Sequence, residues 1–235
     1  MDKIEVQVLR ADPVNMPSFL AKLTQRGHEI GTMSDLCELW DATIDSKPSK
    51  PLLMLQHNTI KRMNYITVAV VGLSTKCVSQ LRTHATRLTF LSTSTQYSAY
   101  DKRPDNWVVP ITSRQKTDRI MLEEAYAEIE NIYRRLLDCG IEKDIAGYVL
   151  PQGLRKALII SGHLDAWQYV LQTRLCHRNT QETQHVARLI YAEIEKALGP
   201  EFMIGMLPRC YYGKCEEGKF FCGKKFSEGE VYERL

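Results

Sequence analysis

Residues 65–73 are Tyr-Ile-Thr-Val-Ala-Val-Val-Gly-Leu, and this apolar, β-branched stretch decides the fold. β-Branched side chains favour strands because they pack well on a pleated surface, and a run of this length suits a central strand. Ser74 follows directly and is a good N-cap, since its hydroxyl can accept a hydrogen bond from a free N–H of the next turn. We therefore expect a central strand that leads straight into a helix ending near Thr83.

Further elements are expected on both sides of this strand. The alternation in Ile4–Val8 predicts a half-buried strand, and the stretch from Ser18 to Arg26 predicts a helix. Residues 28–50 are poorly periodic. Residues 83–100 hold eight Ser and Thr residues, which suits either an ordinary loop or a loop that holds a ligand. Four helices are expected downstream. The first covers residues 118–139, the second starts at Pro151 and is interrupted by Gly162, and the other two cover residues 164–176 and 181–198.

These elements predict an α/β fold. We expect one domain over residues 1–235, with a central, mostly antiparallel sheet flanked by helices and a helix-rich C-terminal half. The sequence contains no internal repeat and no linker long enough to separate independent domains. Residues 201–235 are predicted to be an irregular tail that contains cysteines.

Composition excludes several classes of protein. The 31 Lys and Arg nearly balance the 28 Asp and Glu, so a nucleic-acid polymer is not an expected partner. No apolar run approaches the roughly 20 residues of a membrane span, so no membrane association is expected. The N-terminus lacks an apolar signal region, and seven Cys is an odd number. We therefore expect a cytoplasmic protein with reduced thiols.

The common catalytic signatures are missing. The sequence has no G-x-G-x-x-G, no P-loop, no G-x-S-x-G and no H-E-x-x-H. What it has instead is an ordered series of polar segments. In chain order these are Gln56–Thr59, Gln80–Arg87, Ser92–Tyr97, Ala146–Pro151, His163–Trp167, Arg174 and Thr180–Glu182.

In order and spacing these segments resemble the flavin-dependent thymidylate synthases over roughly residues 52–200. That family carries a Gln-x-x-Arg-His-Arg segment, a Ser-x-Arg-Tyr loop, an Ala-Arg-x-x-Leu-Pro turn, an Asn-x-Arg-x-Trp helix and a downstream Arg. The resemblance implies an enzyme that methylates a pyrimidine deoxynucleotide, converting dUMP to dTMP. It also implies FAD as cofactor, with NADPH and methylenetetrahydrofolate as co-substrates, in a homo-oligomer that is a homotetramer with shared active sites.

Residue by residue, the resemblance gives candidate roles. Arg174 is the candidate catalytic residue, facing the pyrimidine ring and favouring its deprotonated form. The candidate flavin contacts are His57, Thr59, His84, Arg87, Ser92, His163 and Tyr169. The candidate nucleotide contacts are Gln80, Arg82, Ser94, Thr95, Gln96 and Arg174.

Several positions depart from the family pattern. Thr83 and Ala85 flank His84, and Gln96 and Gly147 stand where the family has arginines. Replacing an Arg by Gln removes charge assistance, at a cost of about 1–2 kcal/mol per phosphate contact. His163 and Asp165 replace an Asn and an Arg, and Asp165 would repel a flavin diphosphate if it pointed inward. Arg82, Arg87 and Arg155 are the nearby cations that could compensate.

These departures leave two alternatives open. The chain could act on another pyrimidine nucleotide, by methylation or hydroxymethylation. It could also be a non-catalytic relative that keeps the fold for flavin or nucleotide binding.

The tail cysteines Cys210, Cys215 and Cys222 have the spacing C-x4-C-x6-C. A zinc site needs four ligands and usually contains a closer pair, so this set is one ligand short. Cys176 or His177 could complete it across space. We expect reduced structural thiols and no metal.

Overall fold

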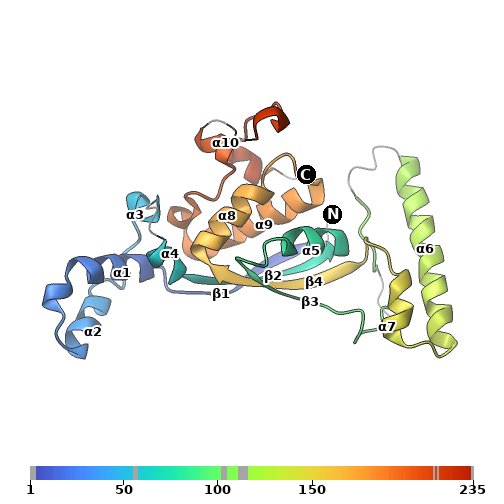
Figure 1. Ribbon diagram of the computed structural model, residues 1–235, viewed down its shortest axis with the longest axis horizontal. Helices are drawn as coiled ribbons and strands as arrows, with labels where there is room; N and C mark the ends of the chain where they lie inside the picture. Colours follow the sequence, from blue (N-terminus) through green and yellow to red (C-terminus); the bar gives the residue numbers. More distant parts are fainter. Residues whose placement is uncertain are drawn as a thin grey trace.

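The computed structural model describes residues 4–54, 58–101, 105–110, 116–213, 215 and 217–233. Within these residues, the centre is a four-stranded sheet in the order β1-β2-β4-β3, and every neighbouring pair is antiparallel. The α/β fold with an antiparallel sheet flanked by helices is therefore confirmed (Figure 1). The strands are β1 (Glu5–Ala11), β2 (Tyr65–Ser74), β3 (Thr89–Ser92) and β4 (Arg155–His163).

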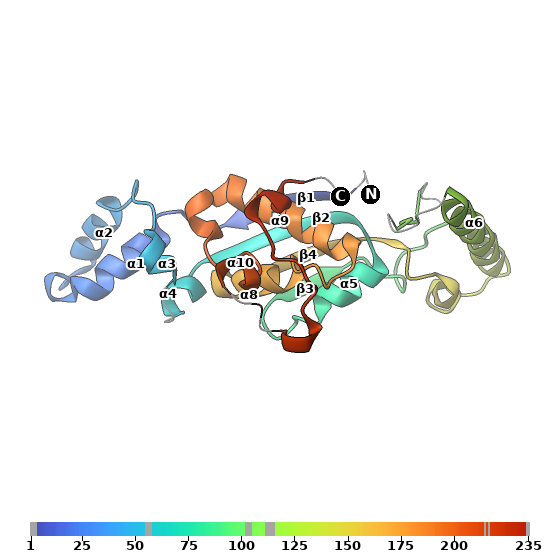
Figure 2. The same ribbon diagram turned by 90° about the horizontal axis from the view of Figure 1, so that it is seen from above.

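The helices form a central layer and two ends. α8 and α9 lie over one face of the sheet, while α1 and α2 form one end of the molecule and α6 and α7 the other (Figures 1 and 2). The helices are α1 (Met16–Gln25), α2 (Met33–Asp41), α3 (Lys50–Met54), α4 (Thr59–Arg62), α5 (Thr75–Arg82), α6 (Lys116–Asp138), α7 (Lys143–Ala146), α8 (Leu164–Arg174), α9 (Gln181–Leu198) and α10 (Arg209–Tyr212). Short 3-10 helices occur at Gly27–Glu29, Gly147–Val149, Pro200–Met203, Gly218–Phe220 and Glu228–Val231.

The main core lies between the sheet and the pair α8 and α9. Alternate residues of β2 and β4, such as Val68 and Leu158, are fully buried there. Trp167 of α8 is also fully buried, and its indole N–H donates to the carbonyl oxygen of Ile66 at 3.2 Å. Burial of such side chains is the largest favourable contribution to folding.

The opposite face of the sheet is uncovered in the described part of the chain (Figure 1). Val71 of β2 is 41% exposed and Leu91 of β3 is 71% exposed. An apolar sheet face open to water is unusual for a monomer, because large exposed apolar patches usually mark interfaces.

One predicted helix is wrong. Residues 155–163 form β4, which pairs with both β2 and β3, whereas a helix was expected from Pro151 to Gly162. Burial alternates with period two along the strand, so Lys156, Leu158 and Ile160 all face the core. A short apolar run suits a helix or a strand equally, and here the pairing with both neighbours decides. The sheet is therefore not confined to the first half of the chain.

α2 and β3 are among the elements that were not expected from the sequence. α2 lies in the poorly periodic stretch 28–50, where Thr32 and Asp35 form a capping box. β3 lies inside the hydroxyl-rich stretch 83–100 and extends the sheet at its edge. The other predicted strands and helices occur within a few residues of their expected bounds.

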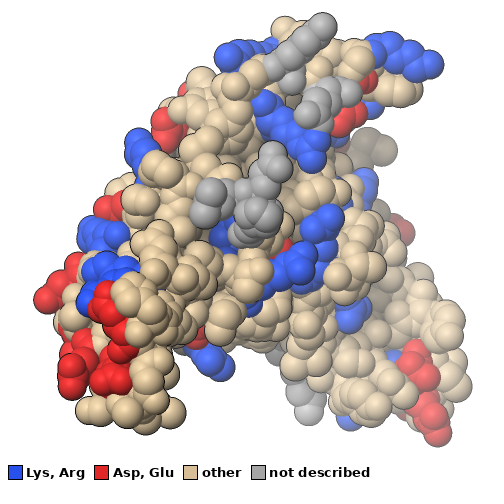
Figure 3. Space-filling model, turned by 60° about the vertical axis from the view of Figure 1, so that its left-hand side comes forward, with Lys and Arg blue, Asp and Glu red and all other residues tan. Residues whose placement is uncertain are grey.

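Charge is unevenly distributed over the surface. Figure 3 shows Lys and Arg side chains gathered in the middle of one face, with Asp and Glu mainly toward its lower edges. Within the described residues, every helix is too short or too polar to cross a bilayer.

Candidate active site

The predicted site residues gather mainly around α5, whose start is tightly held. The Ser74 hydroxyl caps the helix by accepting from the backbone N–H of Cys77 at 3.0 Å. The Glu182 carboxylate, in the first turn of α9, accepts from both the backbone N–H and the hydroxyl of Ser74, at 2.7 and 2.6 Å. Charge-assisted bonds of this kind are among the stronger ones, so α5 is fixed against α9.

A polar cavity of about 360 Å³ lies on one side of α5. It contains four of the predicted residues, Arg82, Ser92, Ser94 and Thr95. We call it the hydroxyl cavity, because six of its lining side chains carry hydroxyls, two are cations and none is a carboxylate. Such a lining suits an anion. The cavity is lined by Thr75, Val78, Ser79, Arg82, Ser92, Thr93, Ser94, Thr95 and Lys156.

Lys156 is a cation of this cavity that was not among the predicted site residues. It is only 7% exposed, and its ammonium donates to the carbonyl oxygen of Thr93 at 3.2 Å and to the hydroxyl of Tyr100 at 3.4 Å. It forms no ion pair within the described residues. A buried ammonium that meets only neutral acceptors is costly, and an anionic ligand would offset that cost.

On the other side of α5, Arg174 forms hydrogen bonds with residues from distant segments of the chain. Its Nε–H donates to Nε2 of His84 at 2.9 Å, and its Nη2 donates to the carbonyl oxygen of Gln80 at 2.7 Å and to the hydroxyl of Thr83 at 2.6 Å. Its Nη1 donates to Oδ1 of Asn179 at 2.8 Å. We call these five residues the Arg174 cluster. Four of the five guanidinium N–H groups are thus used, all toward neutral acceptors, so the positive charge is not cancelled within the cluster.

His84 is neutral in this arrangement. Burial, followed by the nearby charges of Arg174 and Arg87, lowers the pKa of His84 to about 4. The neutral imidazole can accept a hydrogen bond at Nε2, which is the role the Arg174 contact requires. Burial also lowers the pKa of Arg174, but a guanidinium stays protonated at any ordinary pH.

Two further candidate flavin contacts adjoin this cluster. The guanidinium of Arg87 lies over the ring of Tyr169, 3.9 Å from its centroid, and the ring of His84 meets Tyr169 edge-on with centroids 5.8 Å apart. Stacking of this kind presents an exposed cation beside a flat aromatic surface.

The remaining candidates lie elsewhere. Thr59 begins α4, and His163 ends β4, where its ring contacts Tyr65 with centroids 4.6 Å apart. Nδ1 of His163 is buried and has no hydrogen-bond partner in the part of the chain that the structure describes. Gln96 lines a different cavity, beside α7, and Ser92 lies with the nucleotide candidates rather than the flavin candidates. His57 lies outside the described residues.

Two of the departures from the family pattern are clarified by their surroundings. Asp165 accepts a hydrogen bond from Nε of Arg62 at 3.1 Å, so its charge is paired. A Cβ added at Gly147 would lie 3.4 Å from Cβ of Thr95, so this turn sits directly beside the hydroxyl cavity.

One protein family matches most of the chain. A family model described as thymidylate synthase complementing protein matches residues 13–199. The chain belongs to this family. The resemblance drawn from the ordered motifs is therefore confirmed.

Individual relatives of the thymidylate synthase complementing family agree with this assignment. A flavin-dependent thymidylate synthase of Pyrococcus abyssi is 28% identical over 216 residues, which cover 84% of this chain and 88% of the relative. Thymidylate synthase X of Helicobacter pylori, solved with FAD and dUMP, has a TM-score of 0.60 at 16% identity, covering 86% of this chain and 99% of the other. The UMP/dUMP methylase PolB of Streptomyces cacaoi, bound with 5-Br dUMP, has a TM-score of 0.63 at 19% identity, covering 87% and 97%. Both solved structures share the fold.

For a member of this family, the site combines expected and unexpected parts. Gln80, His84 and Arg174 converge although 94 residues separate the first from the last. Lys156 could have been found only by recognising β4 as a strand, because the alternation then places it on the buried face with Leu158. Asn179 and Thr83 carry no such signal, since their role depends on a contact with Arg174.

Proposed function

We propose that this protein methylates a pyrimidine deoxynucleotide, most directly dUMP to dTMP, with FAD as cofactor and methylenetetrahydrofolate and NADPH as co-substrates. The observation that carries the proposal is the pair of sites on either side of α5: an anion-suited hydroxyl cavity and the uncancelled cation of Arg174. A nucleotide needs both kinds of contact, one for its phosphate and one for its base.

The phosphate would occupy the hydroxyl cavity. Lys156 and Arg82 supply positive charge there, and the hydroxyls of Ser92, Ser94 and Thr95 supply hydrogen bonds. Cations that touch a phosphate form charge-assisted bonds roughly twice as strong as neutral ones. Lys156 and Arg82 would thereby compensate for the arginines that are missing at positions 96 and 147.

Arg174 would act on the pyrimidine ring. Its position is fixed by four hydrogen bonds, and one N–H of Nη1 remains for a ligand within the described residues. A fixed cation beside the base favours negative charge that develops on the ring, and no reorganisation is needed at the moment of reaction.

The residues present fit a flavin. His84, Arg87 and Tyr169 offer a ring and a cation beside the middle of α8, whereas Thr59 and Nδ1 of His163, which has no hydrogen-bond partner among the described residues, lie near its start. Tyr169 follows His163 by six residues, which is about 9 Å of helical rise, and an extended dinucleotide can cover such a span. Pairing of Asp165 with Arg62 removes the repulsion expected from a free carboxylate. The flavin would supply hydride transfer, and the protein supplies position and charge.

We also propose that the protein forms a homo-oligomer, specifically a homotetramer. The uncovered sheet face with Val71 and Leu91 supports it, because association would bury that apolar surface. Exposed Tyr97 and Tyr148, 77% and 88% exposed, flank the site and would be covered in the same way. A cytoplasmic location agrees with the free cysteines.

A second candidate substrate is another pyrimidine nucleotide. The specific observation is that Gly147, which stands where the family has an arginine, lies directly beside the hydroxyl cavity, while the structurally similar PolB is named a UMP/dUMP methylase. The base contact through Arg174 would be shared by both substrates.

The experiment compares dUMP, UMP and dCMP under identical conditions. The purified protein is supplied with FAD, methylenetetrahydrofolate and NADPH, and products are identified by liquid chromatography and mass spectrometry. A product one methylene group heavier than dUMP supports the main proposal, and one from UMP or dCMP alone supports the second. No product from any nucleotide, with flavin bound, would contradict both.

A further inference from the structure

Four of the seven cysteines gather at one place, away from the hydroxyl cavity. Cys176 lies just after α8, and Cys210, Cys215 and Cys222 belong to the C-terminal tail. The cavity between α8 and the tail, about 420 Å³, is lined by Cys176, Cys210 and Cys215. A second cavity beside it is lined again by Cys210 and Cys215. The fold thus adds a fourth thiol to a set that is one ligand short in the tail sequence.

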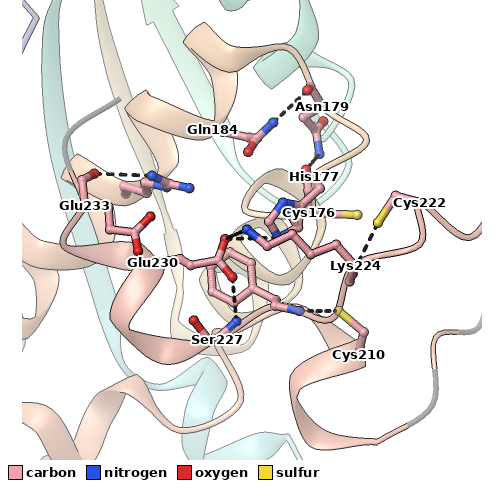
Figure 4. A network of polar contacts seen from close by, with 12 residues as sticks. Cys176, His177, Asn179, Gln184, Cys210, Cys222, Lys224, Ser227, Glu230 and Glu233 are labelled. Carbon is pink, nitrogen blue, oxygen red and sulfur yellow. Dashed lines mark hydrogen bonds and ion pairs between the residues drawn. The ribbon is translucent and has the colours of Figure 1, made fainter.

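The thiols of Cys176, Cys210 and Cys222 lie on the same side of the tail (Figure 4). Figure 4 shows the sulfur atoms of Cys176 and Cys222 pointing into the same space, with that of Cys210 on the same side. The sulfur of Cys210 accepts a hydrogen bond from the backbone N–H of Phe226 at 3.5 Å. Such bonds orient thiolate ligands in metal sites.

The surroundings are suited to a negatively charged centre. Zinc with four thiolates carries two negative charges. Arg178 and Arg209 line the first cavity together with one carboxylate, Glu217, and Lys225 lines the second. The tail also lies at the top of Figure 3, where several Lys and Arg side chains are visible. Gly218 and Gly223, with φ of +53° and +80°, allow tight turns between and after the cysteines.

The tail needs an attachment of this kind. It contains little regular structure, and Phe226 and Val231 are the buried apolar side chains that it contributes after Cys210 in the described residues. Buried Glu230 adds polar contacts, with Lys224 at 3.0 Å and His177 at 3.2 Å (Figure 4). Irregular segments with few apolar contacts are commonly held by disulfides or a structural metal.

We propose that Cys176, Cys210, Cys215 and Cys222 form a structural zinc site that fastens the C-terminal tail to the end of α8. Binding exchanges protons for metal: four thiols and one Zn²⁺ give a tetrathiolate zinc centre and release four protons, with no redox change. Within the described residues no three potential ligands already stand at coordinating positions, so the thiols move together when the ion binds.

This site would also support the catalytic one. Cys176 and Asn179 share the short turn after α8, and Asn179 accepts from Nη1 of Arg174 and donates to the carbonyl oxygens of Thr173 and Cys176. Fixing Cys176 to the tail would therefore hold the turn that positions Arg174. The four cysteines position this turn and do not themselves touch substrate.

The test is the zinc content of the purified full-length protein, measured by inductively coupled plasma mass spectrometry. We expect about one zinc per chain in the wild type, and at least fivefold less in Cys210→Ser and Cys222→Ser. Cys37→Ser and Cys139→Ser are matched controls, because both thiols are exposed and lie far from the tail in the sequence; both should keep the full zinc content.

A second measurement covers variants that fail to fold. Titration of the wild-type thiols with a mercurial reagent should release zinc, detected by a chromogenic chelator, as the four tail-site thiols react. A wild-type protein without zinc after expression in zinc-supplemented medium would overturn the proposal. So would an intact mass lower by pairs of hydrogens, which indicates disulfides. Neither readout depends on nucleotide methylation, so the two proposals fail separately.

Discussion

Substituting Lys156 by Met should separate nucleotide binding from stability. Methionine has a similar length and no charge, so Lys156→Met keeps most of the packing while removing the ammonium from the hydroxyl cavity. A charge-assisted contact to phosphate contributes about 1.5–3 kcal/mol, which corresponds to an increase of about 10- to 150-fold in the Kd for dUMP.

Stability should change little in the same variant. The substitution removes two hydrogen bonds, to Thr93 and Tyr100, but it also removes the cost of burying an ammonium without a carboxylate partner. These contributions oppose each other, so we expect the free energy of unfolding to stay within about 1 kcal/mol of the wild type, or to rise. A binding loss without a stability loss is the signature of a functional charge.

The assay is calorimetric titration with dUMP and, in parallel, with deoxyuridine, which lacks the phosphate. Lys156→Met should weaken dUMP binding and leave deoxyuridine binding unchanged. Lys76→Met is the matched control, because Lys76 is an exposed lysine of α5 outside the cavity and its loss changes the net charge equally. Equal weakening of both ligands by Lys156→Met, or equal weakening of dUMP by both variants, would refute a phosphate contact at Lys156.

Three further outcomes are expected. Arg174→Ala should lower turnover by about 10²–10³-fold, and it should lower the free energy of unfolding by about 2–4 kcal/mol because four hydrogen bonds are lost. Steady-state kinetics measures the turnover and urea unfolding measures the stability. A wild-type value in either measurement would contradict the role of the Arg174 cluster. The folded-state pKa of His84, about 4, lies below its usual value, so the unfolded chain takes up this proton first as pH falls. The free energy of unfolding of the wild type should therefore decrease by about 1–2 kcal/mol between pH 6.5 and 4, a value that allows for screening by nearby water. In urea titrations, His84→Gln should lack this decrease. Equal pH dependence of stability in the two proteins would contradict a buried, neutral His84. Leu91→Asp should reduce the particle mass in light scattering, because it charges the uncovered sheet face, whereas an unchanged multimer would place the interface elsewhere.

The sequence predicts the framework of this fold better than its contacts. The helix over 181–198 and the strand that begins at Tyr65 occur as expected, since long amphipathic periodicity and β-branched runs are strong local signals. Residues 155–163 were predicted wrongly because Pro151 and Gly162 resemble helix-terminus signals, while the pairing that makes β4 a strand lies far away in the sequence.

The candidate site shows the same limit. Ordered motifs placed Gln80, His84 and Arg174 in one site, and they meet in the structure. The contribution of Arg174 to stability follows only from the structure, because an isolated sequence gives no sign that this side chain forms four hydrogen bonds. Lys156 was missed with the strand that carries it.

The most direct test of the central claim is tritium release from dUMP labelled at C5 of the ring. Transfer of a one-carbon unit to C5 must expel the hydrogen there, so release into water reports the reaction itself. With FAD, methylenetetrahydrofolate and NADPH present, we expect tritium release together with dTMP, and loss of both in Arg174→Ala. Flavin-loaded protein that binds dUMP but releases no tritium and forms no dTMP would contradict it.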